Sequence, residues 1–131
     1  MKKHVQFGKR QVGDGLPCFI TFEAGPTHTG LESAQRLVRH AAKAGVDAVK
    51  FQMLDPDRLV ADKKQLFSYR VLIDRETGET EAVNEPLYDI FVRRALKKEE
   101  WCALKSECDA LGLSFFACST ARVSFINTFS C

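Results

Sequence analysis

The sequence predicts an α/β fold with a parallel sheet, and five segments carry that prediction. Residues 18–24, 46–52 and 113–118 are short apolar runs of the kind that form buried parallel strands. The stretches 31–44 and 98–111 repeat their apolar residues every three to four positions, as amphipathic helices do. The resulting order β-α-β-α-β favours parallel strands joined by right-handed crossovers.

The composition is that of one ordinary globular domain and excludes several classes of protein. The 131 residues are 45% hydrophobic and 27% charged. A net charge of +2 is too small to favour nucleic acid or a membrane surface as a partner. No apolar run approaches the ~20 residues that span a bilayer, and the N-terminus lacks the apolar core of a signal peptide. The five cysteines include no Cys-x-x-Cys pair, which indicates reduced thiols in a cytoplasmic protein rather than a zinc or disulfide framework.

The first half of the chain begins with a predicted hairpin. Its residues alternate loosely around Gly8-Lys9, so we set residues 1–15 apart as an N-terminal extension. A loop follows the first strand. Thr29 is the candidate N-cap of the helix after that loop, and Gly45 is the residue expected to end it.

A structured insertion separates the second strand from the second main helix. Residues 53–97 are far longer than an ordinary connection of this kind, and such segments are typical of lids or specificity elements. Within them, 68–73 and 80–83 predict a hairpin, and Pro86 predicts the start of a short helix. Three strands and two helices cannot close a barrel, which needs eight strands. We therefore expect a piece of a larger fold, with an atypical tail over 119–131.

Polar side chains stand where the first two strands end. Glu23, Lys50 and Gln52 lie on strand faces opposite the apolar residues, and parallel α/β sheets bind ligands at the carboxyl ends of their strands. A phosphate or carboxylate ligand is the simplest partner for Lys50; a structural Glu23–Lys50 ion pair, or a lysine that reaches solvent, is the alternative. Glu23 is a candidate general acid or base, or a group that positions a substrate hydroxyl, and Gln52 is a candidate neutral hydrogen-bond partner.

Four further residues are candidates for substrate binding. His28 lies in the loop after the first strand, where it either joins the site or packs the loop. Cys118 ends the third strand and is either a pocket residue or a buried, inert thiol. Ser119 and Thr120 follow as candidate phosphate-binding hydroxyls.

Three of these segments resemble the N-acetylneuraminate (sialic acid) synthase family. Residues 19–30 are similar to its opening I-A-E-I-G-x-N-H-x-G, residues 44–52 to A-G-A-D-A-V-K-F-Q, and residues 112–118 to G-I-x-F-F-S/A-T. The resemblance covers the chain from about residue 13 to residue 118. Thr27 stands where the family has asparagine, and Cys118 stands where it has threonine. The sequence after Cys118 departs from that of the family's helix and resembles an altered or out-of-frame tail.

The resemblance implies a (β/α)8 TIM-type barrel, of which residues 16–118 would hold the first three strands and two main helices. It implies an enzyme that condenses phosphoenolpyruvate with an N-acylated amino sugar, of the N-acetylmannosamine type, to a nonulosonic acid. By motif match, Lys50 would hold phosphoenolpyruvate, Glu23 would act on the sugar or the intermediate, and Gln52 would line the pocket. A divalent cation, Mn or Mg, and a homodimer are implied as well.

Because the family's metal-binding histidines have no counterpart in this chain, we expect the 131 residues to be inactive by themselves. Two alternatives stay open. The chain could derive from another phosphoenolpyruvate-using or aldolase-type barrel enzyme, or it could be a non-catalytic small domain that binds anions.

Overall fold

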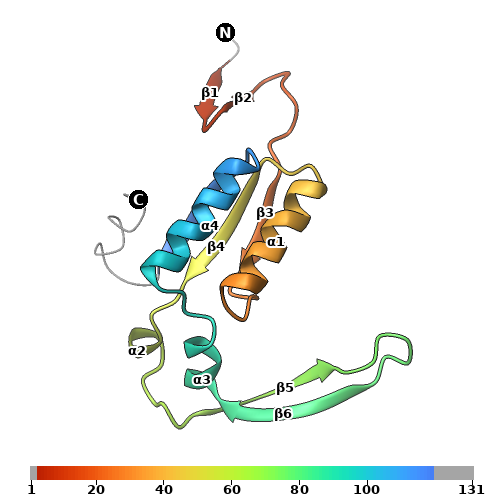
Figure 1. Ribbon diagram of the computed structural model, residues 1–131, viewed down its shortest axis with the longest axis vertical. Coiled ribbons are helices and arrows are strands. Elements are labelled where there is room, and N and C mark those ends of the chain that lie inside the picture. The colour runs from red at the N-terminus through yellow and green to blue at the C-terminus, as the bar shows by residue number, and fades with distance from the viewer. Residues whose placement is uncertain (1–2, 120–131) are drawn as a thin grey trace.

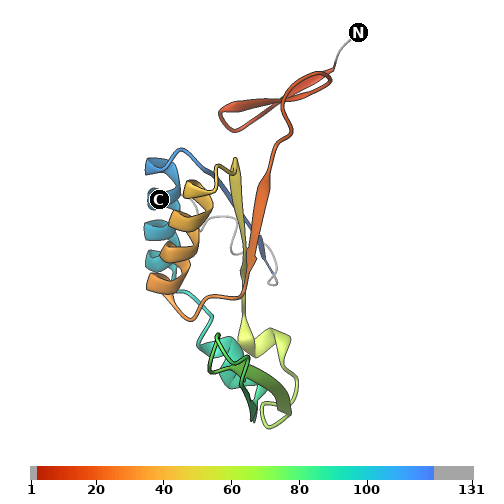
Figure 2. The same cartoon turned by 90° about the vertical axis from the view of Figure 1, so that its right-hand side faces the viewer.

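A three-stranded parallel sheet covered on one face by two helices forms the body of the molecule (Figures 1 and 2). This computed structural model describes residues 3–119. The strands lie in the order β3-β4-β7, with the bounds Thr21–Gly25, Ala48–Met53 and Ser114–Ser119. The two helices are α1, Leu31–Lys43, and α4, Lys98–Ala110. The predicted α/β order is confirmed.

Side-chain alternation gives the sheet one apolar and one polar face. The apolar face packs under α1 and α4, and its centre is Phe51, whose ring lies 6.1 Å from that of Trp101 and is fully buried. Because successive residues point to opposite faces, Lys50 and Gln52 must lie on the other face of β4. The buried residues of the helical side are Ala24, Ala34, Val38, Ala41, Val49, Phe51, Met53, Trp101, Leu104, Cys108 and Leu113.

The N-terminal hairpin lies beyond the amino ends of the parallel strands (Figure 2). It consists of β1, His4–Phe7, and β2, Arg10–Gly13, paired antiparallel as predicted. The ring of Phe7 packs edge-on against Phe19 and Phe116, with centroid distances of 4.9 and 6.1 Å. The hairpin therefore covers the amino end of the polar face and leaves the carboxyl end open.

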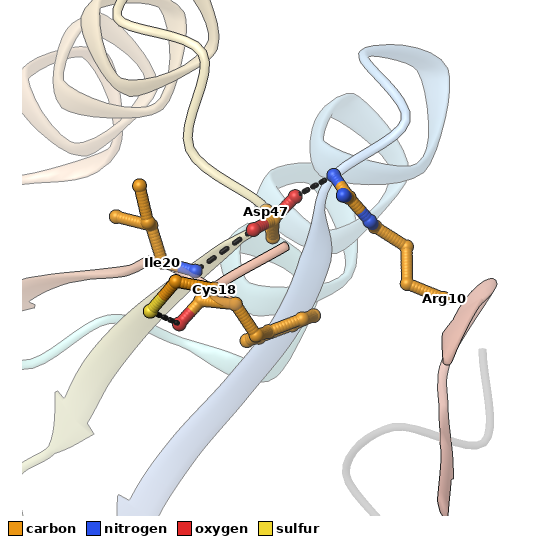
Figure 3. Close-up of polar contacts among 5 residues, drawn as sticks. Arg10, Cys18, Ile20 and Asp47 are labelled. Atoms are coloured by element: carbon orange, nitrogen blue, oxygen red, sulfur yellow. Dashed lines mark hydrogen bonds and ion pairs between the residues drawn. The ribbon is translucent and has the colours of Figure 1, made fainter. Parts of the chain in front are cut away.

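Asp47 ties the hairpin to the sheet (Figure 3). One oxygen of its buried carboxylate accepts a hydrogen bond from Arg10, and the other accepts from the backbone N–H of Ile20 at 2.8 Å. The backbone of Asp47 also bonds Ile20 and Ser114, at 2.8 and 3.0 Å. The Asp47 side chain thus accepts one hydrogen bond from the hairpin and one from the backbone directly before β3.

Replacing Asp47 by alanine is expected to lower the free energy of unfolding by about 1–3 kcal/mol, because the Ile20 N–H loses its buried acceptor. Urea unfolding measures the loss, and hydrogen exchange across residues 4–13 should accelerate because the hairpin loses its Arg10 anchor. Asp47→Asn retains one oxygen acceptor and is the matched control. A chain with Asp47→Ala that keeps the original stability would contradict the anchoring role.

The insertion between β4 and α4 forms an arm at the carboxyl ends of the strands (Figure 1). A two-stranded antiparallel hairpin makes up most of it, longer at both strands than the sequence predicts. Glu85 connects the hairpin to the helix that follows, since it accepts two hydrogen bonds from Arg93 and one from Tyr69. These contacts, Arg93 first, lower the pKa of Glu85 to about 2. The arm's elements are α2 (Pro56–Leu59), β5 (Leu66–Leu72), β6 (Thr80–Pro86) and α3 (Leu87–Val92).

Two local predictions need correction. The N-cap of α1 is Gly30 rather than Thr29, and no side chain caps this end. Gly45 does follow the helix in a left-handed conformation, with φ at +78°, and its N–H bonds the carbonyl of Ala42. Cys102 is disulfide-bonded, so the expectation of reduced thiols throughout is wrong for that residue.

The proposed boundaries at residues 15, 53–97 and 118 stay predictions. Ser119 ends β7, and the rest of the predicted tail, residues 120–131, lies outside the described residues.

Candidate functional site

A pocket of about 240 Å³ opens at the carboxyl ends of the parallel strands. It brings together four residues that the sequence singles out: Glu23 of β3, Lys50 and Gln52 of β4, and Cys118 of β7. Parallel register explains this, because Lys50 lies beside Glu23 on one side and Gln52 lies beside Cys118 on the other. The full lining is Glu23, Gly25, Pro26, Lys50, Phe51, Gln52 and Cys118.

An ion pair between Lys50 and Glu23 dominates the pocket's electrostatics. The Lys50 ammonium donates to one carboxylate oxygen of Glu23, and the other oxygen accepts the Gly25 N–H at 2.9 Å. The hydrogen bond to Glu23 raises the pKa of Lys50 above its usual value, with further contributions from Cys118, so the ammonium stays charged. The side chains are 32% and 53% exposed. The Glu23–Lys50 ion pair that the sequence offered as an alternative is therefore present. Both side chains remain partly exposed to solvent.

Gly25 shapes the rim of the pocket, where the backbone takes a tight path. Its φ of +52° lies in the left-handed region that favours glycine, and the β3–β4 register shifts between Glu23 and Gly25. This irregularity brings the Gly25 N–H round to the Glu23 carboxylate. The Gly-Pro pair directly after the strand was the available signal, since both residues line the pocket.

Cys118 is an exposed free thiol, so the alternative of a buried, inert cysteine is wrong. Its side chain lines the same pocket as Lys50 and contributes to the raised pKa of that ammonium. Ser119 continues the strand; nothing is assigned to its side chain. Thr120 lies outside the described residues.

His28 lies on the opposite side of the sheet from the pocket. The loop after β3 turns back through a hydrogen bond from Thr27 Oγ1 to the Ala24 carbonyl, at 2.8 Å. The His28 ring is fully buried, 5.8 Å from the ring of Phe51 and 6.3 Å from that of Trp101. Neither ring nitrogen has a hydrogen-bond partner among the described residues. The structure thus does not bring His28 to Glu23 and Lys50, and places it in the core, as the packing alternative has it.

The described residues offer no ready metal site. Across residues 3–119 no three His, Cys, Asp or Glu side chains converge in a way that could hold a metal ion. Over the same range, every helix is too short or too polar to cross a bilayer.

The comparison with protein families decides the affiliation of the chain. The model of the NeuB family matches residues 37–131, which is most of the sequence. The chain belongs to the NeuB family. The match extends to residue 131, and the atypical tail over 119–131 stays a prediction.

Named relatives agree with this affiliation. The chain is 31% identical to N,N'-diacetyllegionaminic acid synthase of Legionella pneumophila over 84% of its own length and 29% of that protein. It is 48% identical to human N-acetylneuraminate-9-phosphate synthase over 33% of its length and 12% of that protein. The chain therefore spans less than a third of the length of these curated relatives.

A solved structure confirms the fold. The crystal structure of N-acetylneuraminic acid (sialic acid) synthetase from Leptospira borgpetersenii superposes with a TM-score of 0.71. The alignment covers 99% of this chain and 38% of that one, at 23% sequence identity. The strands, helices and N-terminal hairpin described above are thus the partial barrel that the sequence predicts.

Proposed function

We propose that the pocket is the phosphoenolpyruvate subsite of an enzyme that condenses phosphoenolpyruvate with an N-acylated amino sugar of the N-acetylmannosamine type. The product would be a nonulosonic acid, and the pathway one of carbohydrate biosynthesis in the cytoplasm. Family membership supports the reaction class, and the names of the relatives support the sugar class. The single observation that carries the assignment is the charged Lys50 ammonium at the carboxyl end of a parallel strand, inside an open pocket.

Lys50 is suited to hold a doubly charged three-carbon anion. An ammonium has three N–H donors, and Glu23 takes only one of them. A phosphate or carboxylate oxygen can therefore bind Lys50 while the pair with Glu23 persists or loosens. Gln52, on the same face of β4, adds an amide that can donate to one oxygen of the ligand and accept from a hydroxyl.

Glu23 is held ready to act on the second substrate. Its carboxylate is oriented by Lys50 and by the Gly25 N–H, so few rotamers remain to be lost when a sugar hydroxyl binds. Once a ligand anion shares Lys50, the carboxylate oxygen facing the pocket can accept a proton from the sugar or position its hydroxyl.

The divalent cation implied by the family does not fit the described residues. Glu23 and His28 lie on opposite sides of the sheet, and no cluster of three ligands exists in residues 3–119. If the enzyme uses Mn or Mg, other residues must hold it. Because the chain spans less than a third of the length of these curated relatives, we propose that the 131 residues alone do not turn over. The family resemblance implies that the active enzyme functions as a homodimer.

Phosphate release tests the proposed reaction. The full-length protein is incubated with phosphoenolpyruvate and a panel of aldoses, and N-acetylmannosamine or a related N-acylated sugar is expected to trigger release. Release only with erythrose-phosphate or arabinose-phosphate would contradict the sugar class and favour another barrel synthase. No phosphoenolpyruvate-dependent release with any sugar, together with retained anion binding, would favour a non-catalytic domain.

A further inference from the structure

The hairpin of the arm is a ribbon of two strands whose outer edges are unpaired. Within residues 3–119, β5 and β6 pair only with each other, and the ribbon projects away from the parallel sheet (Figure 1). A two-stranded ribbon alone is marginally stable in water, whereas a sheet of three or more strands with an apolar face is stable. Three large apolar side chains of β5 are nevertheless exposed, those of Leu66, Phe67 and Leu72. The ribbon therefore has the features of a surface that gains a partner strand.

The two free edges of the ribbon differ in their backbone donors. At one end of the ladder the Ile73 N–H donates to the Glu79 carbonyl, at 2.9 Å. At the other end the Leu87 N–H donates to the Gln65 carbonyl, also at 2.9 Å. Because hydrogen-bonded pairs alternate along an antiparallel ladder, the odd-numbered residues of β5 bond β6 and the even-numbered residues point outward. The outward residues are Leu66, Ser68, Arg70 and Leu72 on β5, and Thr80, Ala82, Asn84 and Pro86 on β6.

Proline protects the edge of β6 and not that of β5. Pro86 has no N–H, so the outer edge of β6 lacks one donor, as the edges of natural sheets often do. Self-pairing of β6 around Val83 would also place Glu81 opposite Glu85 of the second copy, and like charges in that position are destabilising. Every outward residue of β5 has an N–H, so β5 is the edge that is open to pairing.

We propose that the free edge of β5 pairs antiparallel with β5 of a second copy of this chain, around a two-fold axis at Tyr69. The product is a four-stranded sheet in the order β6-β5-β5-β6. A two-fold contact uses the same patch on both copies, so the strand must complement itself. This inference names a surface for the proposed homodimer and does not rest on the proposed reaction.

The sequence of β5, Leu-Phe-Ser-Tyr-Arg-Val-Leu, is self-complementary around Tyr69. With the axis at this residue, Leu66 lies opposite Leu72 of the second copy, and Phe67 lies opposite Val71. Apolar and aromatic side chains opposite one another are the pairs that stabilise antiparallel strands. The register uses the whole strand and covers exposed apolar side chains on both copies.

Arg70, which carries the only charge in β5, decides against the neighbouring registers. The outward groups of the two copies must meet, so the axis passes through a residue rather than between two. An axis at Arg70 would place two guanidinium groups opposite each other, and an axis at Ser68 would place Leu66 opposite Arg70. With the axis at Tyr69, Arg70 lies opposite Ser68. Its guanidinium is already bound by Thr80 of its own hairpin, at 2.8 Å.

A cysteine on the predicted axis tests the contact directly. In this register Tyr69 faces its own counterpart in a non-hydrogen-bonded pair, with Cα atoms about 4.5 Å apart, which a disulfide can span. The full-length protein with Tyr69→Cys is oxidised, and mass spectrometry should identify a peptide in which residue 69 is linked to residue 69. Val83→Cys is the matched control, because Val83 lies directly opposite Tyr69 on β6. It should give only the background of random collisions; equal or greater linkage at residue 83 would overturn the proposal.

Proline substitutions test the edge without adding a thiol. Ser68 and Asn84 face each other across the hairpin, and their side chains are hydrogen-bonded at 3.2 Å. Both N–H groups point outward, so proline at either position leaves the β5–β6 ladder bonds intact and removes the same side-chain contact. Ser68→Pro should raise the dimer Kd by about tenfold or more in sedimentation equilibrium, because each copy loses an inter-chain hydrogen bond. Asn84→Pro should leave it unchanged, and equal effects of the two prolines would count against pairing through β5.

The outcomes separate this contact from the proposed function. A dimer that Ser68→Pro weakens and that Tyr69→Cys links supports both the homodimer and the arm contact. A dimer that neither change affects retains the proposed homodimer and overturns the arm contact. A protein that stays monomeric overturns both, whereas the proposed reaction is tested independently by phosphate release.

Discussion

Replacing Lys50 by methionine is expected to weaken phosphoenolpyruvate binding by about 10- to 100-fold, the range for losing a charge-assisted hydrogen bond to an anion. Methionine keeps the length of the side chain and its packing on β4, but removes every N–H donor. The melting temperature should change little, because the Lys50 side chain is one-third exposed and its pair with Glu23 is open to solvent. Calorimetric titration of the full-length protein measures the affinity, and a thermal scan measures the stability.

The control for this substitution is Lys43→Met, which removes one positive charge from an exposed position at the end of α1. It should leave phosphoenolpyruvate affinity unchanged, since only a general loss of charge would affect both variants alike. Equal affinity of the Lys50→Met protein and the unaltered protein would refute the role assigned to Lys50.

Stability is expected to fall as the pH drops below about 6.5, because His28 is buried in its neutral form. Burial, and next the positive charge of Arg94, lower the pKa of His28, against a smaller opposing effect of Glu100. A folded-state pKa below the unfolded value means that the unfolded chain binds the proton first. The neutral ring's contribution is thus fully present above the unfolded pKa and declines below it, by at most about 1.4 kcal/mol per pH unit.

Urea midpoints between pH 8 and pH 5 measure this dependence. His28→Phe removes the titrating group and retains an aromatic ring between Phe51 and Trp101, so its stability should depend less on pH over this range. His40→Ala is the matched control, because it removes a histidine that is exposed on α1. An unaltered slope in the His28→Phe chain would contradict the buried, neutral histidine.

The sequence predicts the sheet and its polar face well because strand periodicity is a local property. Alternation along residues 46–52 places Lys50 and Gln52 opposite Phe51, and the structure keeps them there. Register then brings Glu23 and Cys118 beside them. The pocket and an anion partner for Lys50 could be anticipated from the ends of the strands, whereas the identity of the substrates was inferred from family resemblance.

Loop paths and long-range anchors could not be predicted in the same way. Whether His28 faces the pocket or the core depends on how the chain turns after β3, which a single histidine in a Gly- and Pro-containing loop does not reveal. Asp47 joins groups that are distant in sequence, since its carboxylate binds both Arg10 and the Ile20 N–H. Such a contact depends on how the hairpin packs against the sheet, which the local sequence pattern does not determine.

The most direct test of the central claim is a crystal structure of the full-length protein with phosphoenolpyruvate. We expect the ligand in the pocket formed by β3, β4 and β7, with a phosphate or carboxylate oxygen within hydrogen-bond distance of Lys50 Nζ. Phosphoenolpyruvate bound elsewhere, with the Lys50–Glu23 pair intact and the pocket empty, would contradict the account.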